Sequence, residues 1–118
     1  MSQQNESGLR TFKATTDLEP FRRVKLTAST GDAVEYAGAG EAYIGFTAAK
    51  ALAGEFVGVN LKTSARTFKA VAAEALAVGA SLYGAANGKV QDTVSGSIQA
   101  TALEAAGGDG EVIEVLPA

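Results

Sequence analysis

Short apolar or alternating segments, separated by glycine-containing turns, follow one another from Thr11 to the end of the chain. A new segment begins about every ten residues, which is typical of short strands joined by tight turns. The segments that we expect to form strands are Phe12 to Thr15, Phe21 to Thr27, Ala33 to Tyr36, Ala42 to Ala48, Glu55 to Leu61, Thr67 to Val71, Ser81 to Tyr83, Lys89 to Thr93, Ile98 to Leu103 and Glu111 to Leu116. This pattern predicts an all-β fold, a small barrel or sandwich of short strands.

Two local signals add detail to the strand pattern. Asn87 and Gly88 lie between two apolar segments, and both tolerate the positive φ of a hairpin turn. The apolar positions before Gly79 also follow helical spacing, and a glycine there would end a helix. The sequence therefore predicts one hairpin at Asn87 and one short helix from about Ala73 to Val78.

The two halves of the chain resemble each other weakly. Three pairs of segments match in the same order: Gly31 to Tyr36 with Gly79 to Tyr83, Tyr43 to Ala48 with Ser97 to Ala102, and Gly54 to Val59 with Gly110 to Val115. The separation between partners grows along the chain, so the loops of the two halves must differ in length. We interpret the similarity as an internal duplication in which two copies of a three-stranded unit close one barrel.

The N-terminal residues differ from the rest of the chain. Residues 1 to about 10 are polar and show no hydrophobic period, and we expect an extended arm over residues 1–16, ahead of a single β-barrel-like domain over residues 17–118. Residues 1–25 carry five Lys or Arg against three Asp or Glu, whereas residues 26–118 carry five against ten. A mildly basic arm therefore precedes an acidic body.

The amino-acid composition excludes most kinds of catalytic site. The 118 residues include no His and no Cys, which excludes histidine catalysis, thiolate nucleophiles, disulfides and zinc-thiolate sites. The run from Gly84 to Val90 is one residue short of a nucleotide-binding loop and ends in Val where that loop needs a hydroxyl. Glu111 and Glu114 would face opposite sides of a strand, unlike a catalytic carboxylate pair. We expect no catalytic residue, no cofactor and no metal.

Charge and hydropathy narrow the possible partners. A net charge of −3 argues against a general affinity for nucleic acid, because neutralising phosphates requires a surplus of Lys and Arg. No apolar run approaches the ~20 residues of a membrane-spanning helix. The first residues also lack the charged and apolar regions of a signal peptide, which predicts a soluble protein made in the cytoplasm.

The order of the segments resembles the small decoration proteins of tailed-phage capsids, also called cement or head-stabilising proteins. The residues that carry the resemblance are the turn and strand Gly31 to Val34, the stretch Tyr43 to Ala48, the run Ala77 to Val90, and the closing segment Ala102 to Leu116. The resemblance spans Phe21 to Leu116. Its motifs are glycines, alanines and alternating valines, and they include no catalytic signature.

The resemblance implies a structural virion protein, made in the host cytoplasm, that binds the outer surface of an icosahedral head. It implies homotrimers that bridge neighbouring major capsid proteins and so stabilise the capsid. We expect the arm to pair with a coat-protein strand edge, with Phe12 as an apolar anchor and basic side chains facing coat carboxylates. The candidate contact residues are Arg10, Thr11, Phe12, Lys13, Arg22 and Arg23.

Two alternatives remain open at the level of sequence. Tyr36, Tyr43 and Tyr83 could line the concave face of an enzyme or a carbohydrate-binding β module. The same chain could also serve as another phage component, in the tail or between head and tail. Without any role in binding, Arg22 and Arg23 would lie on opposite faces of a solvent-exposed edge strand.

Overall fold

The computed structural model describes residues 8–27 and 31–118, and nearly all regular structure in them is β-strand. The ten strands of the described residues are β1 Leu9–Ala14, β2 Arg23–Leu26, β3 Ala33–Tyr36, β4 Gly45–Thr47, β5 Phe56–Leu61, β6 Phe68–Val71, β7 Ser81–Gly84, β8 Val90–Gln91, β9 Ala100–Ala102 and β10 Val112–Pro117. Each expected segment overlaps one of these strands, and the predicted all-β class is confirmed. In the part of the chain that the structure describes, no helix could cross a membrane.

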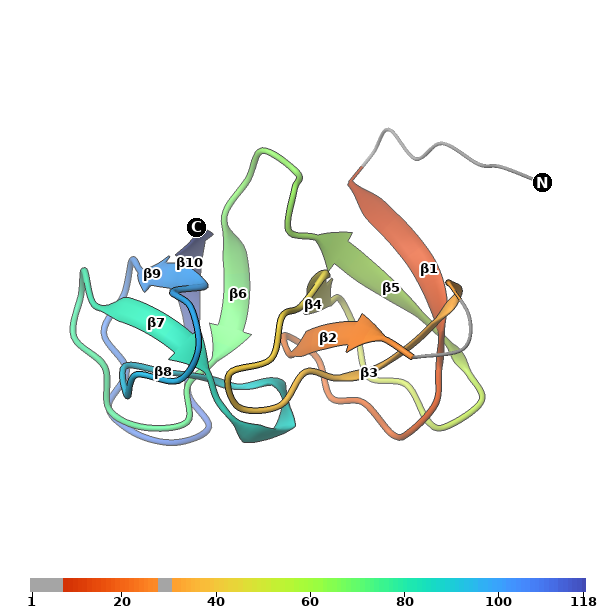
Figure 1. The fold of residues 1–118 in the computed structure, drawn as a ribbon, viewed down its shortest axis with the longest axis horizontal. Coiled ribbons are helices and arrows are strands. Elements are labelled where there is room, and N and C mark those ends of the chain that lie inside the picture. The colour runs from red at the N-terminus through yellow and green to blue at the C-terminus, as the bar shows by residue number, and fades with distance from the viewer. Residues whose placement is uncertain (1–7, 28–30) are drawn as a thin grey trace.

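The strands form two sheets side by side (Figure 1). The first five close into a barrel in the order β1-β3-β2-β4-β5, in which β1 runs antiparallel to β5 and parallel to β3. The second five form a sheet in the order β6-β10-β9-β7-β8. An isolated parallel bridge between Ala72 and Val90 joins the β6 end of this sheet to β8. The second sheet therefore curls toward the closed form that the first one reaches.

The two sheets are copies of one five-stranded unit. Reading β6 to β10 in place of β1 to β5 reproduces the neighbours of each strand. The bridge from Leu18 to Ala51 recurs as the bridge from Leu76 to Ala106. The N–H of Gly54 donates to Ala14 O, and the N–H of Gly110 donates to Ala72 O, both at 2.8 Å.

The duplication is thus confirmed, but its predicted size is wrong. The repeating unit has five strands, and each copy builds its own sheet in place of a shared barrel. The match of Gly54 with Gly110 is correct, whereas β3 corresponds to β8 and not to β7. Gly31 and Gly79 both lie in turns, and the match between their segments rested on this shared feature and on apolar bias.

The expected N-terminal arm is corrected over Leu9–Ala14. This segment is strand β1 and pairs with β5 from Leu9 to Lys13. Phe12 and Ala14 lie in the barrel core, with 2% and 0% of their surface exposed. Alternation of Phe12 and Ala14 with polar neighbours is the ordinary pattern of a half-buried strand. Residues 1–7, the first part of the expected arm, lie outside the described residues.

The expected helix from Ala73 to Val78 is also wrong. The N–H of Leu76 donates to Ala106 O at 2.9 Å, and the N–H of Gly79 donates to Ala102 O at 2.8 Å. These partners lie on another segment, so the N–H groups cannot bond within a helix. Among the described residues the helical element is the 3₁₀ turn Ala86–Gly88. It lies in the β7–β8 hairpin, where Asn87 has the predicted positive φ.

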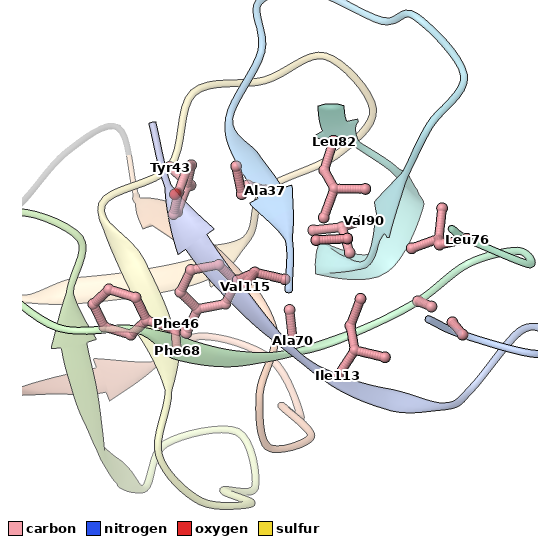
Figure 2. Packing of buried hydrophobic residues seen from close by; sticks show 14 residues of the cluster. Ala37, Tyr43, Phe46, Phe68, Ala70, Leu76, Leu82, Val90, Ile113 and Val115 are labelled. Atoms are coloured by element: carbon pink, nitrogen blue, oxygen red, sulfur yellow. The ribbon is translucent and has the colours of Figure 1, made fainter. Parts of the chain in front are cut away.

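Buried side chains form two clusters, and one of them joins the sheets. The barrel is filled by Phe12, Ala14, Leu18, Val24, Val34, Ala51, Val57 and Val59. The second cluster combines β6 to β10 with Tyr43 and Phe46 of the first half. The Phe46 ring stacks on Phe68 at a centroid distance of 5.2 Å, and Tyr43 meets Phe46 edge to face (Figure 2). The two sheets therefore share a hydrophobic core.

Candidate attachment surface

The four candidate contact residues on β1 lie on two faces of the strand. Thr11 and Lys13 are exposed on the outer face of the barrel. Arg10 folds back, with its guanidinium 4.6 Å from the centre of the Phe12 ring and its Nη1 donating to Gly31 O at 3.2 Å. Phe12 belongs to the barrel core, so it is unavailable as an anchor for another protein.

Arg22 is half-buried between the two halves. Its guanidinium lies 5.7 Å from the centre of the Tyr36 ring, and its Nη1 donates to Asn87 O at 3.0 Å. Its backbone N–H donates to Thr47 Oγ1 at 3.0 Å. Arg22 thereby ties β2 to the β7–β8 hairpin, and part of its side chain stays accessible.

Arg23 is fully buried, which corrects the interpretation of this residue as part of a solvated strand edge. Nε donates to Lys89 O at 3.0 Å, and Nη1 donates to Gln99 Oε1 at 2.9 Å. The remaining acceptors of the guanidinium are the carbonyl oxygens of Ala37, Gly38, Glu41 and Ala85. Burial lowers the pKa of Arg23 to about 10, so the side chain is still charged at neutral pH. A guanidinium satisfied in this way binds protein and is not open to a ligand.

The surroundings of Arg23 explain why the fold accommodates it. A Cβ atom at Gly84 would lie 2.8 Å from Arg23 Nη1, so only glycine leaves room for the guanidinium. Gln99 is held in place because its Nε2 donates to Glu41 O at 2.7 Å. Acceptors come from both halves of the duplication, and Arg23 therefore fastens the two sheets together.

A groove of about 660 Å³ runs between the sheets. Phe46 and Phe68 form its floor but are almost wholly covered. Its polar residues are engaged with one another: Arg66 Nη1 donates to Asn60 Oδ1 at 3.1 Å, Thr67 Oγ1 donates to Glu114 Oε2 at 2.6 Å, and the Glu114 N–H donates to Glu104 Oε1 at 2.7 Å. These bonds join a guanidinium to an amide, a hydroxyl to a carboxylate and a backbone N–H to a carboxylate, and none of them sets a nucleophile beside a base.

Of the three tyrosines considered for a carbohydrate site, Tyr43 is buried and cannot line an open surface, whereas Tyr36 and Tyr83 are half-buried. Tyr43 is 5% exposed, and its hydroxyl donates to Gln99 O at 3.2 Å. Burial raises the pKa of Tyr43 to about 12. The Tyr36 hydroxyl accepts from the Glu19 N–H at 2.8 Å. Within the described ranges, no group of three acidic residues is placed to hold a metal ion.

Sequence reasoning missed the most prominent apolar side chain on the β1 and β5 strands. Phe56, the first residue of β5, is 73% exposed and stands opposite Lys13 of β1. The signal was present in the chain: Val57 and Val59 alternate inward, which turns Phe56 outward.

The fold and the joint at Arg23 define an all-β protein made of two fused five-stranded copies. No family model and no curated protein sequence matches the chain. Among solved structures, it is similar to the head fiber gp8.5 N base of bacteriophage phi29, with a TM-score of 0.77 and 16% sequence identity. The alignment covers 93% of this chain and 92% of that chain. The likeness establishes a shared fold over nearly the whole length of both.

Proposed function

We propose that the chain is a structural protein of a tailed-phage virion. It binds the outer surface of the icosahedral head as a homotrimer and stabilises the head by bridging neighbouring major capsid proteins. It carries out no catalysis and needs no cofactor. The observation that carries the proposal is the full-length similarity to the base of a phage head fiber.

The architecture supports this role in two further ways. The guanidinium of Arg23, the main polar group in the interior, hydrogen-bonds the two sheets to each other and makes the fold rigid. Few other polar side chains are buried among the described residues. Large apolar side chains also remain on the surface; Phe56 and Val94 are 73% and 75% exposed. Aromatic side chains such as Phe56 are enriched in the buried core of protein interfaces.

The proposal is tested by electron cryo-microscopy of virions from the phage that encodes the chain. Density for the chain on the outside of the head, in threefold groups that contact two or more coat subunits, is the expected result. Density in the tail or at the head-to-tail junction would instead support the alternative of another virion component. Virions that lack the chain altogether would overturn the proposal.

A further inference from the structure

Asn87 and Gly88 form the one Asn-Gly pair of the chain. In such a pair the backbone nitrogen of the glycine attacks Cγ of the asparagine side chain more readily than in any other, because glycine has no Cβ atom to hinder the approach. The other asparagines, Asn5 and Asn60, are each followed by a residue with a side chain. Asn87 is exposed in the β7–β8 hairpin, so solvent reaches its side-chain amide. The hairpin therefore carries a chemically reactive pair.

The backbone conformation of the hairpin holds the two reacting groups apart. Asn87 has a φ of 57° and a ψ of 33°. At this ψ the Gly88 nitrogen lies nearly opposite Cβ of Asn87 across the Cα–C bond, whereas attack on Cγ needs the two on the same side. The ring can close only after the peptide group between Asn87 and Gly88 has rotated.

Hydrogen bonds to the first half of the chain oppose that rotation. The N–H of Gly88 donates to Ala37 O at 3.1 Å, and Asn87 O accepts from Arg22 Nη1 at 3.0 Å. Both polar atoms of the peptide group are thus bonded to the first half. Gly88 is also tightly enclosed, since a Cβ atom there would lie 2.6 Å from Arg23 O. The contact between the two halves therefore keeps the pair from reacting.

We propose that Asn87 is a latent deamidation site, which reacts when the β7–β8 hairpin separates from the first half. On separation, the Gly88 nitrogen loses its proton to water and forms a bond to Asn87 Cγ. The side-chain amide nitrogen takes up a proton and leaves as ammonia. Water then opens the resulting succinimide to aspartate or isoaspartate, so the reaction consumes one water and releases one ammonia. This inference is independent of any role on a phage head.

The test follows Asn87 in the purified full chain at mildly alkaline pH, by mass spectrometry of its peptides. Wild type is incubated folded and in urea, because urea separates the two halves completely. Asn60 is the internal control, since the side chain of Leu61 hinders ring closure in both conditions. Two variants are compared in the same way: Arg22→Met removes the donor to Asn87 O, and Gly79→Ala strains a turn within the second half. Circular dichroism confirms that both variants fold.

Deamidation of Asn87 is expected to be at least about tenfold slower in the folded chain than in urea, because only the opened fraction reacts. Arg22→Met should speed the reaction of the folded chain several-fold and leave the rate in urea unchanged, while Gly79→Ala changes the folded rate clearly less. Equal rates in the folded chain and in urea would overturn the inference, as would an Asn87 that stays intact in urea. Equal acceleration by the two variants would also overturn it, by showing that overall stability rather than the contact of the hairpin protects Asn87.

Discussion

Phe21 and Gly79 occupy equivalent turns in the two halves, and both have positive φ, at 61° and 84°. The N–H of Phe21 donates to Thr47 O at 2.9 Å, and that of Gly79 donates to Ala102 O at 2.8 Å. Glycine adopts this conformation without strain, whereas a bulky side chain does not. In the first half the strain is offset, because Phe21 O accepts from the Val71 N–H at 3.2 Å and Lys69 lies 5.5 Å from the centre of its ring.

At position 21 a glycine is therefore expected to give a more stable protein than an alanine, although alanine is usually the more stabilising of the two. Phe21→Ala keeps the backbone strain and loses the ring, while Phe21→Gly loses the ring but relieves the strain. We expect the glycine variant to have the higher free energy of unfolding, by about 1 kcal/mol. Gly79→Ala should be destabilising by a similar amount. Urea denaturation of the three variants measures this, and an alanine variant more stable than the glycine variant would contradict the strain argument.

Removing the charge at Arg23 should destabilise the whole molecule. Arg23→Met leaves buried carbonyl oxygens without donors, at roughly 1–3 kcal/mol for each unsatisfied group. The free energy of unfolding is expected to fall by at least about 3 kcal/mol. Arg23→Lys should recover only part of this loss, because an ammonium cannot reproduce the planar guanidinium. Arg22→Met, at the half-buried neighbouring position, serves as control and should cost clearly less.

The close contact between Gly84 and the Arg23 guanidinium can also be tested by substituting the glycine. Gly84→Ala places a methyl group against the guanidinium, which cannot move away without breaking its hydrogen bonds. We expect a loss of about 2 kcal/mol in unfolding free energy. Gly108→Ala is the matched control, because nothing lies within 4 Å of a Cβ atom there and its φ is not positive. Equal stability of the two variants in thermal denaturation would refute the close contact.

The strands were predictable because they lie in short apolar or alternating segments that the local sequence displays. Val57 and Val59 point inward from β5, for example, and turn glycines such as Gly54 and Gly110 mark where strands begin. The internal repeat could be detected in the sequence for the same reason. Sheet closure was not visible, since the parallel contact of Ala14 with Val34 joins residues whose sequences carry no sign of each other.

The burial of Arg23 could not be inferred from its neighbours. In the sequence it alternates with Val24 as a solvent-facing residue would, but the start of β2 is buried on both faces because the second half of the chain covers Arg23. The cover depends on Gly84 and Gln99, which lie more than 60 residues away in the chain. Phe12 was misassigned for the opposite reason: its polar neighbours suggested an arm, although the alternation itself indicated a strand.

Tyr43 should make stability sensitive to alkali. Its pKa is about 12 in the folded protein, raised by burial from the ordinary value of 10.0. A raised folded pKa means that the contribution to stability is complete below pH 10 and is lost as the pH rises toward 12, because the unfolded chain releases the phenol proton first. A shift of this size corresponds to about 3 kcal/mol. In Tyr43→Phe this part of the alkaline loss should disappear, while stability at neutral pH changes little, since Gln99 O still accepts from the Ala118 N–H at 3.1 Å. Arg23, whose pKa is lowered by burial to about 10, titrates in the same pH range and interacts with Tyr43, so the difference between the two chains reports the phenol together with its interaction with Arg23. Urea denaturation at a series of pH values provides the measurement, and parallel curves for the two chains between pH 10 and 12 would show that the Tyr43 hydroxyl is not buried as described.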